Sequence, residues 1–150
     1  MEFETKAHEE IYHRVEGFLK EIFGEMADKA PDRPVFLLQR GSSVTHIVVA
    51  PWSDDDAVVI VRSYVNYGAD LVPDLLKHLL RENANMRFGA FGIDSDGDIF
   101  FEHTIVGSTC DKEEIKHSVL AVSSTADQYD EPIQERWGGL REVDRAKQLP

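Results

Sequence analysis

Three aspartates, Asp94, Asp96 and Asp98, are the residues whose types and spacing most readily suggest chemistry. Alternating carboxylates open the calcium-binding loop of the EF-hand, where they converge on one hard cation. That loop needs a glycine at its sixth position and a bidentate glutamate at its twelfth. This sequence has Ile99 and Ile105 at those positions. Because Asp and Gly are also the preferred residues of tight turns, we interpret the aspartates as a hairpin turn.

The six histidines and the single cysteine show no zinc-ligand spacing. Cys110 and His103 could serve as a nucleophile and its base, since such partners meet in space and not in sequence. However, no sequence signature of a cysteine enzyme surrounds Cys110, and no loop suggests an oxyanion hole. The sequence therefore predicts no catalytic residue, no metal site and no cofactor, and an enzyme built on Cys110 is the weakest of three hypotheses.

The charge balance disfavours nucleic acid and membrane partners. Sixteen basic and 28 acidic residues give a formal net charge of −12, which repels phosphate backbones and anionic lipid. No apolar run approaches the ~20 residues that span a bilayer. A single cysteine cannot form an internal disulfide, and the acidic start does not resemble a signal peptide. We expect a cytoplasmic protein.

The chain length predicts one domain, 1–150, with its core at about 3–139 and a frayed tail at 140–150. Helical periodicity predicts a first helix over 3–26, a short leucine helix that begins near Pro73, and a last helix that begins after Asp111. Pro132 should kink or restart that last helix. Strand patterns cover 35–40, 43–52, 57–65, 88–93 and 99–106. The fold class is therefore α+β, an antiparallel sheet with the order α-β-β-β-α-β-β-α.

Two of these strands carry apolar residues on both faces, which is unusual for an antiparallel sheet with one solvated face. Either the three helices are divided between the two faces, or a second chain covers one face or an edge. The last helix adds an apolar seam with steps of three and four residues. The candidate partner or dimer surface is therefore Val58, Ile60, Tyr64, Phe100, Ile115, Val119, Val122 and Tyr129.

Three stretches together resemble the YbjN-type domain, a bacterial family that shares the fold of class I type III secretion chaperones. They are GSSVTHIVVAPWSDDDAVVIVRSYV, LLKHLLRENANMRFGAFGIDSDGDIFFEHTIVG, and the last helix with its ADQYD and WGG segments. The similarity spans about residues 35–139, and the helix over 3–26 fits the first helix of that fold. The most specific part is the leucine helix followed by Asn83, then Phe88-Gly89-Ala90-Phe91 and the acidic hairpin.

The resemblance implies a non-enzymatic protein of the kind described as a sensory transduction regulator or chaperone-like module. Secretion chaperones of this fold are acidic homodimers that hold an extended segment of a partner protein. We therefore expect a chaperone-like or regulatory protein-binding module that forms a homodimer. A small-molecule or metal sensor that uses the acidic turns or the histidines is the alternative from another class.

Overall fold

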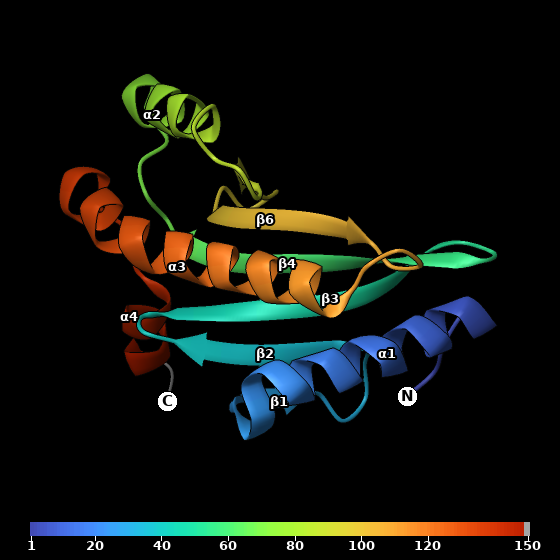
Figure 1. Ribbon diagram of the computed structural model, residues 1–150. Coiled ribbons are helices and arrows are strands. Elements are labelled where there is room, and N and C mark those ends of the chain that lie inside the picture. The colour runs from blue at the N-terminus through green and yellow to red at the C-terminus, as the bar shows by residue number, and fades with distance from the viewer. Residues whose placement is uncertain (149–150) are drawn as a thin grey trace.

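The computed structural model describes residues 1–148. A six-stranded antiparallel sheet, in the order β1-β2-β3-β4-β6-β5, carries the helices (Figure 1). The strands are β1 (Ala27–Lys29), β2 (Val35–Arg40), β3 (Ser43–Ser53), β4 (Asp56–Asn66), β5 (Ala90–Ile93) and β6 (Ile99–Val106). The helices are α1 (Lys6–Phe23), a 3-10 turn (Gly24–Met26), α2 (Pro73–Asn83), α3 (Lys112–Trp137) and α4 (Glu142–Gln148).

Local sequence signals explain where the long helices begin. Thr5 caps α1, because its hydroxyl accepts a hydrogen bond from the His8 N–H at 3.0 Å. Asp111 caps α3 in the same way through the Glu114 N–H, at 2.8 Å, as its position before the helix predicts. Pro132 does not restart α3, which runs without a break to Trp137. The fully buried Ile133 packs into the core just beyond the proline, so tertiary packing carries the helix past it.

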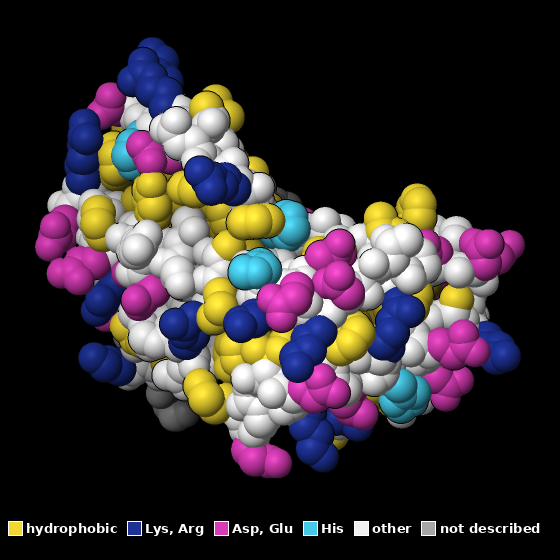
Figure 2. Space-filling model, in the orientation of Figure 1, with side chains coloured by type: hydrophobic (Ala, Val, Ile, Leu, Met, Phe, Trp, Pro, Cys, Tyr) yellow, Lys and Arg dark blue, Asp and Glu magenta, His cyan; other side chains and the backbone are white. Residues whose placement is uncertain are grey.

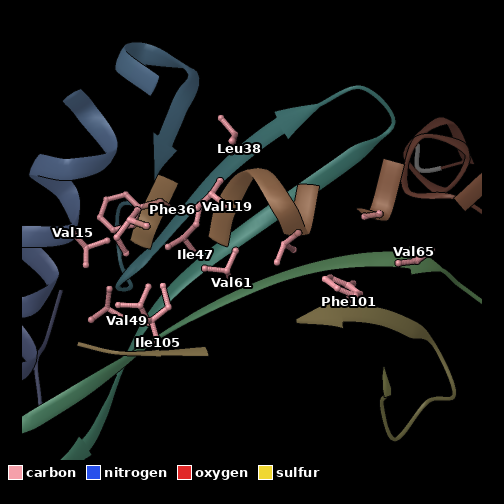
Figure 3. Close-up of a cluster of buried hydrophobic side chains, with 14 of the residues drawn as sticks. Val15, Phe36, Leu38, Ile47, Val49, Val61, Val65, Phe101, Ile105 and Val119 are labelled. Carbon is pink, nitrogen blue, oxygen red and sulfur yellow. The ribbon is translucent and has the colours of Figure 1, made fainter. Parts of the chain in front are cut away.

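The core lies between the sheet and one layer of helices. α1 and α3 contact each other and the central strands β3 and β4 on the same face, which we call the inner face. Figure 3 shows the side chains that meet there from α1, α3 and four strands. α2 joins this core through Leu75 and Leu79, which are buried, and it contacts β5. The three longer helices, α1, α2 and α3, are therefore not divided between the two faces of the sheet.

The predicted order of elements is confirmed, and the structure adds a strand and a helix to it. β1 pairs with β2 through only three residues at the edge of the sheet. α4 forms where we expected a frayed tail, and a backbone bridge between Tyr67 and Leu140 holds its start. An ion pair between Arg141 and Asp144, 2.9 Å apart, lies at the same place. Residues 149 and 150, also part of the expected tail, lie outside the described residues.

Burial alternates along the two central strands. In β4, Ala57, Val59 and Val61 are buried against the helices, whereas Val58 and Ile60 between them are half-buried on the opposite face. We call this opposite side of the sheet the outer face. α4 contacts the ends of β3 and β4 near Tyr67, and the three longer helices lie on the inner face. Most of the outer face is thus not covered by a helix, and only its end near Tyr67 is in contact with α4.

Candidate binding surface

The apolar part of the outer face is built by strand register. Residues directly opposite one another in an antiparallel pair point to the same side of the sheet. Val48 of β3 lies opposite Ile60 of β4, and Ala50 lies opposite Val58. On the other side of β4, Val58 lies opposite Val106 of β6. These five side chains form a continuous apolar patch across three strands, which we call the outer patch.

A polar row separates the outer patch from an aromatic group on the same face. His46, Arg62 and Glu102 lie opposite one another across β3, β4 and β6. Arg62 forms an ion pair with Glu102 and lies 3.9 Å from the centre of the Phe100 ring. Burial lowers the pKa of His46, so its imidazole is neutral at neutral pH. The row therefore pairs most of its charge internally and leaves the outer patch as the apolar contact area.

The aromatic group at the end of this face is packed against α4. Tyr64 stacks on Tyr67, with 5.1 Å between their ring centres, and its hydroxyl donates to Asp94 at 2.9 Å. Burial, followed by the hydrogen bond to Asp94, raises the pKa of Tyr64. Arg145 of α4 lies 4.2 Å from the centre of the Tyr67 ring. This end of the outer face is therefore held by contacts within the chain.

The structure divides the residues that we predicted to form a partner surface. Val58, Ile60, Tyr64 and Phe100 lie together on the outer face. Tyr129 of α3 is half-buried, with its ring against Phe91 of β5, and its hydroxyl donates a hydrogen bond to Glu82 of α2. The other three, Ile115, Val119 and Val122, are fully buried in the core.

The placement of Ile115, Val119 and Val122 corrects our interpretation of the α3 seam. These side chains pack against the inner face of the sheet, so they are not available to a partner. A seam with steps of three and four residues fits both a helix that packs on a sheet and a helix that pairs with another chain. The pattern alone could not distinguish the two.

The acidic turn adopts the geometry of a hairpin. One oxygen of Asp94 accepts hydrogen bonds from the N–H groups of Asp96 and Asp98, each at 3.0 Å. Gly97 takes a positive φ of 82°, which glycine adopts without strain. Oxygen atoms of the three carboxylates can be found within 4.8 Å of one another. The hydrogen bonds to Asp94 fix its carboxylate over the turn, and the Asp98 carboxylate accepts from the Gly68 N–H at 3.0 Å, so two of the three carboxylates have partners within the chain.

Cys110 and His103 are each engaged with a different partner. The Cys110 thiol is buried and donates to the Gly107 carbonyl at 3.3 Å. Burial raises the pKa of this thiol, which opposes formation of the reactive thiolate. The His103 ring is hydrogen-bonded through Nδ1 to the Ser118 hydroxyl at 2.8 Å, and burial lowers its pKa. The two side chains are thus held as structural groups.

A second surface was missed by sequence reasoning. A groove of about 560 Å³ runs beside β6 and reaches the first turn of α3. Phe88 and Val106, which line it, are 44% and 42% exposed. In the sequence, Phe88 belongs to a run that resembles a strand, but the paired part of β5 begins only at Ala90. Phe88 is exposed because the pairing of β5 with β6 begins only at Ala90. Local sequence patterns do not predict this point.

Within residues 1–148, no helix has the length and apolar character that crossing a bilayer requires.

The fold and the open sheet face define an α+β protein with an apolar surface of the kind that binds other proteins. The model of one family, described as the T3SS (YopN, CesT) and YbjN peptide-binding chaperone 1 family, matches residues 9–145. The chain belongs to this family. The resemblance to YbjN-type and secretion-chaperone proteins, and the expectation of a protein-binding module, are therefore confirmed.

A solved structure supports the fold independently. A chain in the structure of the HopA1-SchA chaperone-effector complex has a TM-score of 0.60 and 9% sequence identity to this chain. The match covers 82% of this chain and 96% of the other. At such low identity the likeness establishes the shared fold alone. No curated protein matches the chain in sequence.

Proposed function

We propose that this protein is a non-enzymatic chaperone or regulator that binds a segment of a partner protein on its outer face. The observation that carries the proposal is the outer patch, five apolar side chains on three central strands. The three longer helices lie on the other face. Exposed apolar patches on a folded protein commonly mark binding sites. Membership in a family of peptide-binding chaperones favours a peptide segment as the occupant.

The partner should carry apolar side chains next to positive charge. The outer patch supplies the apolar contact, and the net charge of −12 attracts a basic segment over longer distances. This charge would mainly raise the association rate, whereas apolar burial would supply most of the affinity. We also propose a cytoplasmic location, supported by a lone, buried cysteine that has no disulfide partner within the chain.

A second copy of the chain is the other candidate occupant of the outer patch. Two outer patches could face each other across a twofold axis, which is the commonest symmetry of homo-oligomers. The net charge opposes this pairing, so the interface would have to be largely apolar. A homodimer through the outer patch would compete with a peptide for the same side chains, unless the peptide binds elsewhere.

Site-specific photo-crosslinking in the source cell tests the proposal. A photo-reactive phenylalanine analogue replaces Ile60 on the outer patch, and in a matched control it replaces Lys20, which is exposed on α1. We expect one or a few proteins to be cross-linked from position 60 and not from position 20. A product of twice the chain mass would instead identify a second copy. The same products from both positions, or none from position 60, would contradict binding at the outer patch.

A further inference from the structure

One edge of β6 is left partly open. β6 runs from Ile99 to Val106, but its pairing with β5 ends where Ala90 lies opposite Glu102. Just before Ala90 the chain turns away from the sheet at Gly89, which has a φ of 102°. A Cβ atom at Gly89 would lie 2.6 Å from the Glu102 carbonyl oxygen, so only glycine fits this close crossing. Beyond Glu102, no strand among residues 1–148 pairs with β6 on this side.

Hydrogen bonds on both sides of β6 establish which backbone groups face the open edge. The Phe91 N–H and carbonyl bond to the Asn83 side chain, at 2.6 and 3.2 Å, so they point away from β6. Alternation along an antiparallel pair then directs the backbone groups of Ala90 and Gly92 toward Glu102 and Phe100. By the same alternation, Thr104 directs its N–H and carbonyl to the β5 side, where β5 is no longer present.

The hydrogen bonds between β6 and β4 lead to the same assignment of which backbone groups face the open edge. The Gly107 N–H donates to the Ala57 carbonyl at 2.7 Å, which makes them a hydrogen-bonded pair of the β4–β6 ladder. Ile105 and His103, two and four residues earlier, therefore form hydrogen-bonded pairs with β4, whereas Thr104 does not. The Val106 N–H also faces the open edge, whereas its carbonyl accepts from the Cys110 N–H at 3.1 Å. The edge thus offers two donors and one acceptor, from Thr104 and Val106.

The groove beside this edge has an apolar and aromatic floor. The Phe88 ring lies between two histidine rings, with ring centres 5.9 Å from His103 and 6.4 Å from His117. Val106 continues the apolar surface along β6. Figure 2 shows histidine and hydrophobic side chains together in the hollow between α2 and the far end of the sheet. The groove is therefore wide enough, and apolar enough, for side chains that project from an added strand.

The rim of the groove is acidic. Asp111, Glu113 and Glu114, at the start of α3, are exposed there, and Arg87 is the basic residue of the lining. A segment with alternating apolar and basic residues would match both properties. Its backbone would satisfy the open groups of Thr104 and Val106, and its basic side chains would reach the carboxylates.

We propose that an extended partner segment with alternating apolar and basic residues adds to the sheet as a strand beside Thr104–Val106. It would lie in line with β5 and fill the groove at Phe88. This inference rests on the proposed function, because it assigns a site and a chemistry to the bound segment. In this arrangement the main-chain contacts of the bound segment lie at the edge of the sheet, next to the outer patch. Val106 belongs to both the outer patch and the lining of the groove.

The Thr104→Pro variant tests the proposal. Proline removes the N–H that faces the open edge, and proline is tolerated in strands where that N–H makes no ladder bond. The matched control is Thr104→Val, which keeps the N–H. The probe is a fluorescein-labelled synthetic peptide that alternates valine and lysine, and its binding is followed by fluorescence anisotropy. We expect Thr104→Pro to weaken binding by roughly tenfold, as the loss of a backbone hydrogen bond and the proline ring would cause, and Thr104→Val to bind like the original chain.

A modified probe gives the same test without changing the protein. N-methylation of alternate amides in the peptide removes the donors of one edge at a time. Methylation of the edge that faces β6 should abolish binding, whereas methylation of the other edge should not. A peptide that alternates valine and glutamate should bind more weakly than the lysine probe, because the rim is acidic.

Three outcomes would overturn the inference. The first is that the lysine probe does not bind the original chain. The second is equal binding by the original chain and Thr104→Pro, together with indifference to N-methylation. The third is that the Ile60→Asp variant loses the probe while Thr104→Pro retains it, which would place the peptide on the outer patch. That last result would leave the proposed function standing and remove only the edge site.

Discussion

Single side chains tie the turn between β2 and β3 to α3. Asp127 accepts hydrogen bonds from the Ser42 N–H at 2.8 Å and from the Ser42 hydroxyl at 2.6 Å. Asp130, one helical turn further along α3, is buried and lies within hydrogen-bonding distance of the same hydroxyl, whose single proton the two carboxylates share. The hydrogen bonds from Ser42 lower the pKa of Asp127, whereas burial raises the pKa of Asp130. Two neighbouring carboxylates therefore affect folding stability in opposite directions.

The Asp130→Asn variant should change how stability depends on pH. The folded state holds the Asp130 proton more tightly than the unfolded state, whose aspartate pKa is about 3.9. The unfavourable contribution of this residue is absent below that pKa and develops as pH rises through the raised folded pKa. Relative to the original chain, Asp130→Asn should therefore gain free energy of unfolding as pH rises from the unfolded pKa through the raised folded pKa. Urea titrations at several pH values measure the difference, and a difference that is constant with pH would contradict this assignment.

Asp127→Asn is the matched control, and its stability relative to the original chain should change with pH in the opposite direction. The folded pKa of Asp127 is lowered, so its favourable contribution is present above the unfolded pKa and is lost as pH falls through the folded one. This variant should be less stable than the original chain near neutral pH and approach it in acid. If the stability differences of the two variants change with pH in the same direction, one of the two assigned pKa shifts is wrong.

Asp96→Asn should leave stability within about 0.5 kcal/mol of the original, as for exposed surface positions. Asp96 is exposed, and it is its backbone N–H that bonds to Asp94. Added calcium should not change this result, since the turn is explained by its own hydrogen bonds. Thermal unfolding with and without calcium measures it. A calcium-dependent rise in melting temperature that disappears in the variant would favour the metal-sensor hypothesis instead.

At the scale of elements, α2 is anchored by two leucines and not by four. Helical spacing placed Leu75, Leu76, Leu79 and Leu80 on one face. In the structure Leu75 and Leu79 are buried, whereas Leu80 is 70% exposed. Asp74 of α2 also pairs with Arg136 of α3 at 2.8 Å, and His78 packs against Trp137. Helix α2 is thus held both by its two buried leucines and by contacts with the end of α3.

Leu79→Ala should lower the free energy of unfolding by roughly 2–5 kcal/mol, as other buried leucine truncations do. Leu80→Ala, one residue away, should change it by less than about 0.5 kcal/mol, because this side chain is exposed. Chemical denaturation of both variants makes the comparison. A loss below about 1 kcal/mol for Leu79→Ala would mean that α2 is peripheral to the core.

Much of the element order was predictable because it is written in local patterns. β2 and β6 begin and end where the sequence predicts, since turn residues flank both strands. β1 was missed because Ala27-Asp28-Lys29 has little strand propensity and is held by its pairing with β2. α4 was missed for a related reason: its seven residues are largely polar, and the bridge from Leu140 to Tyr67 positions them.

The candidate sites were predictable only in part, because burial depends on which face the helices cover. Alternation in β4 identified Val58 and Ile60 as sharing a face, and the structure leaves that face uncovered by the three longer helices. The same reasoning could not tell that Val119 faces the sheet, since a core helix and an interface helix share one periodicity. The open edge at Thr104 depends on where β5 ends relative to β6, which is a tertiary property.

At the scale of the whole molecule, charge and apolar surface act against each other in self-association. Each chain carries a net charge of −12, which repels a second copy, whereas the outer patch favours contact. We predict a homodimer at micromolar concentration in ~0.15 M salt, where the Debye length is about 8 Å. Its association should strengthen as salt rises, because screening weakens the repulsion without weakening apolar contact.

Light scattering coupled to size exclusion measures this prediction. The dimer should have twice the 17.0 kDa mass of one chain, and Ile60→Asp should convert it to the monomer. If the measured mass is that of one chain across the concentration range and at high salt, the prediction of a homodimer is wrong. The outer patch would then be free for a partner of a different kind.

The most direct test of the central claim is calorimetric titration of the partner segment onto the outer patch. The segment is the one identified by cross-linking from position 60, prepared as a synthetic peptide. We predict a negative heat-capacity change on binding, the signature of apolar burial, and at least roughly tenfold weaker binding to Ile60→Asp than to the original chain. Equal affinity for the two proteins would show that the segment binds elsewhere, and would contradict the outer patch as the binding surface.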